Sequence, residues 1–359
     1  MRIALTLLIC FLAVTARANM ASPIQEGSFA SAPFISRHVD ILRESLLIIP
    51  DDGFQTARFV IEYHIKANRP GSQIPLLFYA SEFREQFSIW LDGREISLKQ
   101  VPESYQELEG TPFTDFGYFF EKEDWSETPR VLLEESPSSG FYVSLDDLKF
   151  FETDLDEGMH VIRVEYVADQ WVDRSGWVKE YSFRYALSPA KYWKSFGELE
   201  ITLDASAFAG RLTTNLGEPA TGSLQTKSIW TFSALPTEVV LITYTPDLNP
   251  LAGFLLAVSP IGLTLILAVL LVALHLWGIK RYRKINTERS SWVVIIGSLL
   301  VPFLILLGYT YTFGLIDAAI GQDAGRYHGY TFLVLILYPV LLPVYWLIMR
   351  WVDRRMRRY

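Results

Sequence analysis

The uncharged apolar run at residues 251–279 constrains the chain most, because it contains no Asp, Glu, Lys or Arg. A run well beyond about 18 apolar residues is long enough to cross the hydrocarbon core of a bilayer as a helix. Two more uncharged runs follow, at 291–316 and 329–349. We therefore predict a membrane domain of three transmembrane helices, over residues 250–279, 291–316 and 329–350, followed by a basic tail at 351–359.

The basic residues around these runs predict their orientation. Five lie between the first two runs and five follow the third, whereas the loop between the second and third runs contains only Arg326. Basic residues in short loops mark the cytoplasmic side. The N-terminal domain is thus predicted to be exported and the C-terminus to be cytoplasmic. The ten basic residues are Lys280, Arg281, Arg283, Lys284, Arg289, Arg350, Arg354, Arg355, Arg357 and Arg358.

The N-terminus has the pattern of a signal peptide. Arg2 precedes an apolar stretch at residues 3–14, and the small-x-small site Ala16-Arg17-Ala18 follows. We predict a signal peptide over residues 1–18, cleaved before Asn19; the alternative is an uncleaved anchor. Cys10 is the only cysteine and lies within this stretch, so the exported domain is expected to fold without disulfides.

The exported domain is acidic. Residues 19–250 contain 19 Lys and Arg and 36 Asp and Glu, a formal charge of 19 − 36 = −17. Such a domain is a poor binder of nucleic acid, whose phosphates are negative. The sequence also has no Asn-x-Ser/Thr glycosylation site. Together with the lack of cysteine, this favours a bacterial cytoplasmic (inner) membrane, with the domain on the periplasmic side.

Strand periodicity dominates residues 19–249. Apolar and polar residues alternate over 58–66, 87–91, 162–166, 181–187 and 199–203, as expected for half-buried strands. Asp92-Gly93 is a hairpin turn signal. These patterns predict an antiparallel β-sandwich, as one large or two small domains. The residues predicted to be buried are Tyr63, Ile162, Tyr166, Phe183, Leu199 and Ile201.

Residues 100–140 interrupt this rhythm. The segment is acidic and aromatic, is rich in Pro and Ser, and has no clean period. A stretch of this length without regular structure is typically a functional loop, a lid or a disordered insertion. We predict an irregular insertion of one of these three kinds.

The search for chemistry identifies no catalytic, cofactor-binding or metal-binding residues. Ser188 and Lys191 match a Ser-x-x-Lys pattern, but it follows a strand and has no partner motif. The carboxylates of Glu152, Asp154 and Asp156 alternate, but they lack the spacing of a calcium loop, and an acidic turn is the simpler interpretation. The five histidines have no metal-ligand spacing. Aromatic residues around Trp171 and Trp177 are interpreted as plugs at the end of the sandwich, with sugar or partner binding as the alternative.

Three functional hypotheses follow, of which transport by the helices alone ranks lowest. The first is a non-enzymatic membrane-anchored envelope protein, whose acidic β domain binds a partner or ligand within a membrane complex. The second is an envelope hydrolase or carbohydrate-active enzyme that uses paired carboxylates of residues 100–158. We favour the first hypothesis because no residues have catalytic spacing.

Overall fold

The computed structural model describes residues 25–26, 29–31, 39–68, 70–79, 83–99, 130–132, 142–144, 148–187, 196–237, 239–286 and 291–357. The predicted signal peptide and most of the irregular segment 100–140 lie outside these ranges. The chain divides into two compact units. The β unit comprises Met1–Asp173 and Glu180–Thr245, and the helical unit comprises Arg174–Lys179 and Pro246–Tyr359.

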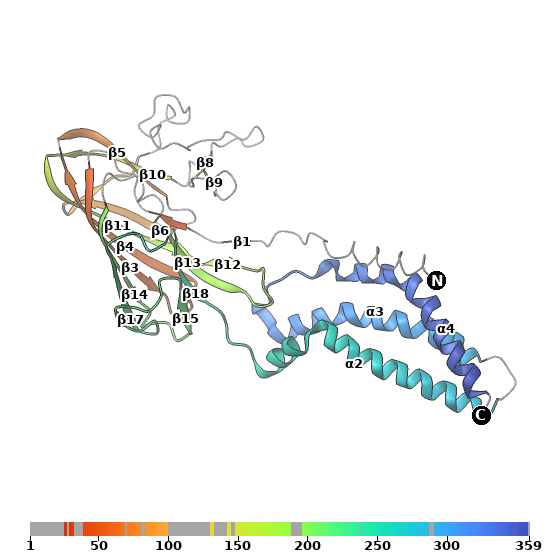
Figure 1. The fold of residues 1–359 in the computed structure, drawn as a ribbon. Coiled ribbons are helices and arrows are strands. Elements are labelled where there is room, and N and C mark those ends of the chain that lie inside the picture. The colour runs from red at the N-terminus through yellow and green to blue at the C-terminus, as the bar shows by residue number, and fades with distance from the viewer. Residues whose placement is uncertain are drawn as a thin grey trace. The chain divides into compact units, whose positions relative to one another are not determined.

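The β unit contains two large sheets (Figure 1). The eight-stranded sheet has the order β16-β17-β14-β3-β4-β11-β6-β7. Its strands are β3 Val39–Pro50, β4 Thr56–Ala67, β6 Phe83–Leu91, β7 Arg94–Ile96, β11 Gly158–Asp169, β14 Phe196–Asp204, β16 Thr221–Gly222 and β17 Lys227–Phe232.

The six-stranded sheet has the order β1-β12-β13-β18-β15, with β2 also paired to β13. Its strands are β1 Gln25–Glu26, β2 Phe29–Ser31, β12 Trp171–Asp173, β13 Glu180–Ala186, β15 Leu212–Thr214 and β18 Val239–Tyr244. Two smaller pairs are β5 Gly71–Tyr79 with β10 Leu148–Leu155, and β8 Arg130–Leu132 with β9 Tyr142–Ser144. Part of the segment predicted to be irregular, residues 130–132, is thus a short strand.

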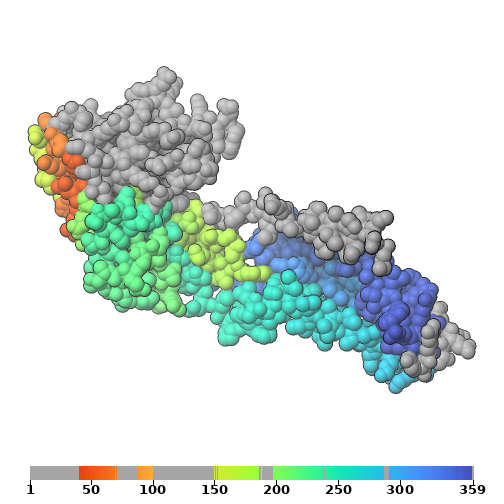
Figure 2. Space-filling model, viewed as in Figure 1, coloured from red at the N-terminus to blue at the C-terminus, as the bar shows by residue number. Residues whose placement is uncertain are grey.

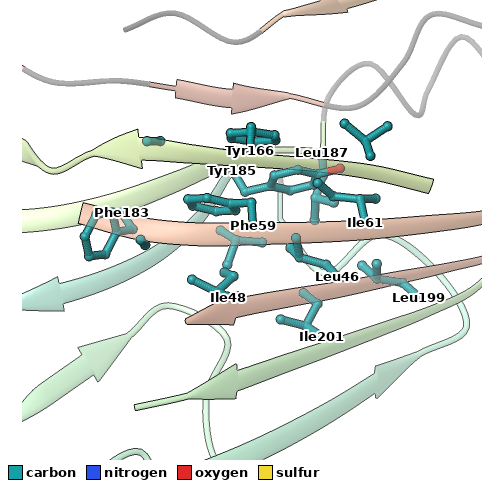
Figure 3. Close-up of a cluster of buried hydrophobic side chains, with 14 of the residues drawn as sticks. Leu46, Ile48, Phe59, Ile61, Tyr166, Phe183, Tyr185, Leu187, Leu199 and Ile201 are labelled. Atoms are coloured by element: carbon teal, nitrogen blue, oxygen red, sulfur yellow. The ribbon is translucent and has the colours of Figure 1, made fainter. Parts of the chain in front are cut away.

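Both large sheets contribute to one apolar core (Figure 3). The six residues predicted to be buried are at most 2% exposed, so the periodicity identified the correct face. Phe59 of β4 stacks on Tyr166 with ring centroids 5.1 Å apart, and lies 6.4 Å from Tyr185 of the other sheet. The predicted hairpin turn is also confirmed, since Asp92 and Gly93 have φ values of 50° and 80°, as a two-residue hairpin turn requires.

The prediction that the strands are all antiparallel is wrong in two places. β14 pairs with β3 in parallel, and β2 pairs with β13 in parallel. A parallel pair needs a long connection, and all of β4 to β13 lies between β3 and β14. Alternation along one strand shows which face is buried but not the direction of its neighbour, so the sequence pattern could not reveal this.

A β-bulge in β3 changes which of its residues face the core. The pairing with β4 shifts between Ile41 and Arg43, and Leu42 is left 40% exposed. Ile41 points inward before the bulge, whereas Glu44 and Leu46 point inward after it. Gly197 of β14 makes room for the bulge, because a Cβ there would lie 1.9 Å from the carbonyl oxygen of Leu42. The bulge therefore places a carboxylate in the core.

The helical unit contains α2 Pro250–Arg283, α3 Trp292–Ile320, the 3₁₀ helices η5 Gly321–Asp323 and η6 Gly329–Leu337, and α4 Tyr338–Met356. Three helical segments coincide with the predicted spans and are long and apolar enough to cross a membrane. Ser259, with φ 65°, breaks α2 before Pro260. The part after the break, residues 260–283, is still about 36 Å long at ~1.5 Å per residue, which is enough for a span.

His275 connects the three long helices. Its Nδ1 lies 2.9 Å from the Tyr345 hydroxyl of α4, and its Nε2 lies 3.2 Å from the Val293 carbonyl oxygen of α3. A Cβ at Gly297 would lie 2.1 Å from Nε2, so the small residue allows this approach. Polar contacts between helices favour association in an apolar environment. The histidine thus has a packing role.

Candidate functional site

The outer face of the eight-stranded sheet bears a row of polar residues around one tryptophan. The pairing places Glu62 of β4 beside Arg163 of β11, and Arg163 beside Trp90 of β6. Glu165, two residues along β11, shares this face because side chains alternate along a strand. We call Arg58, Glu62, Trp90, Arg163 and Glu165 the outer-face cluster.

Ion pairs hold the outer-face cluster in place. Arg163 donates from Nε to Glu165 at 2.9 Å and from Nη1 to Glu62 at 3.2 Å. Arg58 pairs with Glu165 from the other side. The Arg163 guanidinium also lies 6.0 Å from the centre of the Trp90 ring, the outer limit of a cation–π contact. Arg163 is therefore fixed in front of the tryptophan.

A hollow of about 460 Å³ opens over this cluster. Its walls are Glu62, Trp90, Gly93, Val161, Arg163 and Glu165. Trp and Arg are the residue types that most often dominate binding energy at protein interfaces. A preorganised Trp–Arg pair over an open hollow is suited to contact a partner surface or a flat ligand.

The environment of Glu165 in this hollow opposes its use as a general acid. Partial burial raises the pKa of Glu165, but hydrogen bonds from Arg58 and Arg163 outweigh it, so the net pKa lies below its ordinary value. A carboxylate with a lowered pKa is ionised at neutral pH and cannot act as a general acid. Glu165 is thus better suited to holding Arg163 than to donating a proton.

A histidine–carboxylate contact lies beside the hollow, at the β6–β7 turn. His160 Nδ1 lies 2.7 Å from Asp92 Oδ2, and Nε2 lies 2.9 Å from the Asp156 carbonyl oxygen. Burial lowers the pKa of His160, but the hydrogen bonds to Asp92 and Asp156 outweigh this effect and raise it overall. Asp92 Oδ1 also accepts from the backbone N–H of Val161 at 2.8 Å. The Asp92 carboxylate therefore ties the β6–β7 turn to β11.

The second cluster of titratable groups is sealed in the core. The Tyr185 hydroxyl donates to Glu44 Oε1 at 2.7 Å. Because that proton is used, Tyr63 donates to the Tyr185 oxygen at 2.8 Å. Glu44 is 0% exposed, and its Oε2 has no hydrogen-bond partner among the described residues. Burial raises the pKa of Glu44 to about 7, although the hydrogen bond from Tyr185 opposes the shift.

This buried carboxyl makes a testable contribution to the pH dependence of stability. The folded pKa of about 7 lies above the ordinary glutamate pKa of 4.5, so the folded state binds the proton more tightly. Stability is therefore lost as pH rises from 4.5 to 7, by about 3 kcal/mol at ~1.4 kcal/mol per pKa unit. We expect Glu44→Gln, which remains neutral, to unfold at a higher temperature than wild type at pH 8 but at a similar temperature at pH 4.5.

Glu165→Gln is the matched control. Because the pKa of Glu165 is lowered, its contribution to the free energy of unfolding changes with pH in the opposite direction to that of Glu44. Its contribution is present at neutral pH and is lost as pH falls through the folded pKa. Thermal unfolding of the full-length chain in detergent between pH 4 and 8 measures both variants. A Glu44→Gln melting curve that follows wild type at every pH would mean that Glu44 is ionised in the core without cost.

Within the described ranges, the candidate residues named from the sequence do not gather into one site. Glu152 and Asp154 lie on β10, and Asp156 lies in the turn before β11. No group of three or more His, Cys, Asp or Glu residues suited to a metal occurs within the described part of the chain. Residues 188–191, which contain the Ser-x-x-Lys pattern, lie outside the described ranges, as does His38.

The two tryptophans of the predicted aromatic plug have different roles. Trp171 of β12 lies under the Arg184 guanidinium, whose central carbon is 4.2 Å from the centre of the Trp171 ring. Trp177 belongs to the helical unit, where it stacks on Phe313 at 5.6 Å and lies 4.4 Å from the His328 ring. For Trp177 the plug interpretation is therefore wrong, because its neighbours come from the segment around α3.

Sequence reasoning missed Glu44 and the outer-face cluster. The cluster had a signal, since the alternation over 58–66 puts Arg58 and Glu62 together on the polar face of one strand. Their neighbours Trp90, Arg163 and Glu165 come from strands whose order the sequence does not reveal. Glu44 had no comparable signal, because the bulge at Leu42 reverses the alternation.

The fold defines a loose class, a β domain of mixed sheets followed by three long apolar helices. The sequence matches no protein-family model and no curated protein. One solved structure with a similar arrangement is described as a nutrient binding protein from Legionella pneumophila, with 14% identity, a TM-score of 0.40, and coverage of 61% of this chain and 71% of that one.

Two other solved structures have lower TM-scores. An M1 zinc metallopeptidase from Deinococcus radiodurans has 11% identity and a TM-score of 0.27, with 60% of this chain and 46% of that chain covered. Yeast LTA4 hydrolase has 6% identity and a TM-score of 0.32, with 66% and 33% covered. The chain therefore spans less than half of either protein, and similarities at this level carry no functional argument.

Proposed function

We propose that this chain is a membrane-anchored envelope protein whose β domain, a two-layered sandwich, binds a protein partner or ligand as part of a membrane complex. The observation that carries the proposal is the outer-face cluster, in which Trp90 and Arg163 are held over an open hollow. The helices insert in the bilayer as three spans. The ten basic residues support an orientation with the C-terminus in the cytoplasm and the β domain in the bacterial periplasm.

At the outer face, a binding role is favoured over hydrolysis by the environment of two carboxylates. A hydrolase of the paired-carboxylate type needs one accessible acid with a raised pKa. Glu44 has a raised pKa but is sealed in the core, whereas Glu165 lies at the outer face with a side chain 16% exposed, but its pKa is lowered. Neither residue meets both requirements, and most of residues 100–158, where the sequence suggests paired carboxylates, lies outside the described ranges.

A photo-crosslinking amino acid at position 88 tests the proposal in the full-length chain in native membranes. Ser88 is opposite Glu165 in the pairing of β6 with β11, so it lies on the same outer face. We expect a discrete adduct whose yield falls about 30-fold with Trp90→Ala, the loss of ~2 kcal/mol typical of a hot spot. A discrete adduct that forms equally in wild type and in Trp90→Ala would contradict the assignment of the hollow.

Arg43→Gln is the matched control. It removes the ion pair to Glu200 at 2.8 Å on β3 and β14 of the same sheet, outside the hollow. Its adduct yield should equal that of wild type. An enzyme using this face would behave differently, because Glu62→Gln would abolish turnover while adduct formation continued.

A further inference from the structure

The ends of α2 and α4 bring basic residues together. Side chains at the C-terminal end of both helices are exposed, and the two ends meet in the helical unit (Figure 2). Asp353 is the only acidic residue in the stretches 280–286 and 350–357. We call the exposed residues Lys280, Arg281, Lys284, Arg350, Arg354 and Arg355 the basic end.

A buried ion pair fixes the two helix ends to each other. Arg283 of α2 donates from Nε to Asp353 Oδ1 at 2.6 Å and from Nη2 to Oδ2 at 2.7 Å, so the contact is bidentate. Both side chains are only 5% exposed. Arg357 adds a third contact to Asp353 at 3.2 Å. The carboxylate of Asp353 is thus occupied by Arg283 and Arg357, and it does not neutralise the basic end.

Three arginines of the basic end are paired with tryptophans at the same spacing. Arg281 lies 5.8 Å from the Trp277 ring centre, Arg350 5.0 Å from Trp346, and Arg355 4.2 Å from Trp351. Each pair is separated by four residues, which places the two side chains on one face of the helix. Trp277 and Trp351 are 60% and 55% exposed.

This repeated pairing matches the chemistry of a phospholipid headgroup. An indole ring prefers the boundary between acyl chains and headgroups, and a guanidinium four residues nearer the helix end reaches the phosphate level. A guanidinium also binds phosphate oxygens in a bidentate manner. Exposed tryptophans would contribute nothing to the binding of a soluble phosphate, which has no acyl chains. The arrangement therefore favours a lipid over a free anion.

We propose that the basic end of α2 and α4 is a binding surface for anionic phospholipids, with Arg281, Arg350 and Arg355 contacting the phosphates. The surface requires only that the helices lie in a bilayer and does not depend on a partner of the β domain. The Arg283–Asp353 ion pair holds the two halves of the surface at a fixed separation.

Native mass spectrometry of the purified full-length chain in non-ionic detergent tests the proposal. The probe is an equal mixture of phosphatidylglycerol and phosphatidylcholine. We expect wild type to retain phosphatidylglycerol about tenfold better, and the triple variant Arg281→Gln/Arg350→Gln/Arg355→Gln to lose this preference, since each basic residue near a membrane surface contributes measurably to anionic lipid binding. The triple Arg→Lys variant keeps the charge and should retain an intermediate preference.

The control variant Lys66→Gln/Arg94→Gln/Arg211→Gln removes the same charge from exposed positions of the β unit and should bind lipid as wild type does. Added salt should also weaken the retention of phosphatidylglycerol by wild type but not of phosphatidylcholine, a readout that needs no variant. Equal retention of both lipids by wild type, or an unchanged preference in the Gln triple variant, would overturn the proposal. Displacement of the lipid by soluble glycerophosphate would do so as well, because it would indicate a free-phosphate site.

Discussion

Ile201→Asp is expected to prevent the β unit from folding. Ile201 is 0% exposed on β14, and its strand neighbours in the pairing are Trp230 of β17 and Leu46 of β3. A carboxylate there would be surrounded by apolar side chains, and an uncompensated buried charge costs several kcal/mol. Because total domain stability is typically only ~5–15 kcal/mol, a loss of this size with an added cavity leaves little folded protein.

Thr202→Asp is the matched control, one residue along the same strand and on the opposite face. It adds the same charge but leaves the core unchanged, so its melting should stay close to that of wild type. Near-ultraviolet circular dichroism and limited proteolysis of the full-length chain distinguish the two variants. An Ile201→Asp chain with native melting would show that the sheet face has been assigned incorrectly.

Asp353→Ala is expected to destabilise the helical unit by roughly 3–5 kcal/mol, the usual cost of removing one partner of a buried ion pair. The Arg283 side chain, only 5% exposed in wild type, would stay in place. Its guanidinium would lose the two Asp353 carboxylate oxygens that accept its hydrogen bonds. The main loss is therefore the uncompensated charge of Arg283, and the packing lost with a small side chain is a minor part.

The double variant Arg283→Met/Asp353→Leu tests that explanation. Replacing both partners with apolar residues removes the charge as well as the pair, so it should recover most of the stability lost by Asp353→Ala. Thermal unfolding in detergent, followed by tryptophan fluorescence, measures the two variants against wild type. If the double variant is less stable than Asp353→Ala, the ion pair contributes attraction that exceeds its desolvation cost.

Much of the architecture follows from the sequence because it depends on local periodicity. The alternation at 58–66 and 199–203 determines which residues face the core, since a strand has a side-chain period of two. Asp92-Gly93 determines its turn, because these residue types tolerate positive φ. The three uncharged runs determine the helices, since no other backbone structure satisfies its own hydrogen bonds over that length in an apolar environment.

The tertiary structure decided the features that depend on which distant segments meet. The parallel pairing of β3 with β14 and the bulge at Leu42 place Glu44 beside Tyr185, which is 141 residues away. The outer-face cluster needs the order β4-β11-β6, which no single strand encodes. Arg283 and Asp353 are 70 residues apart and both lie in basic stretches, where the sequence suggests only surface charge. Periodicity specifies which face of an element is buried, but the packing of distant elements specifies which side chains face each other there.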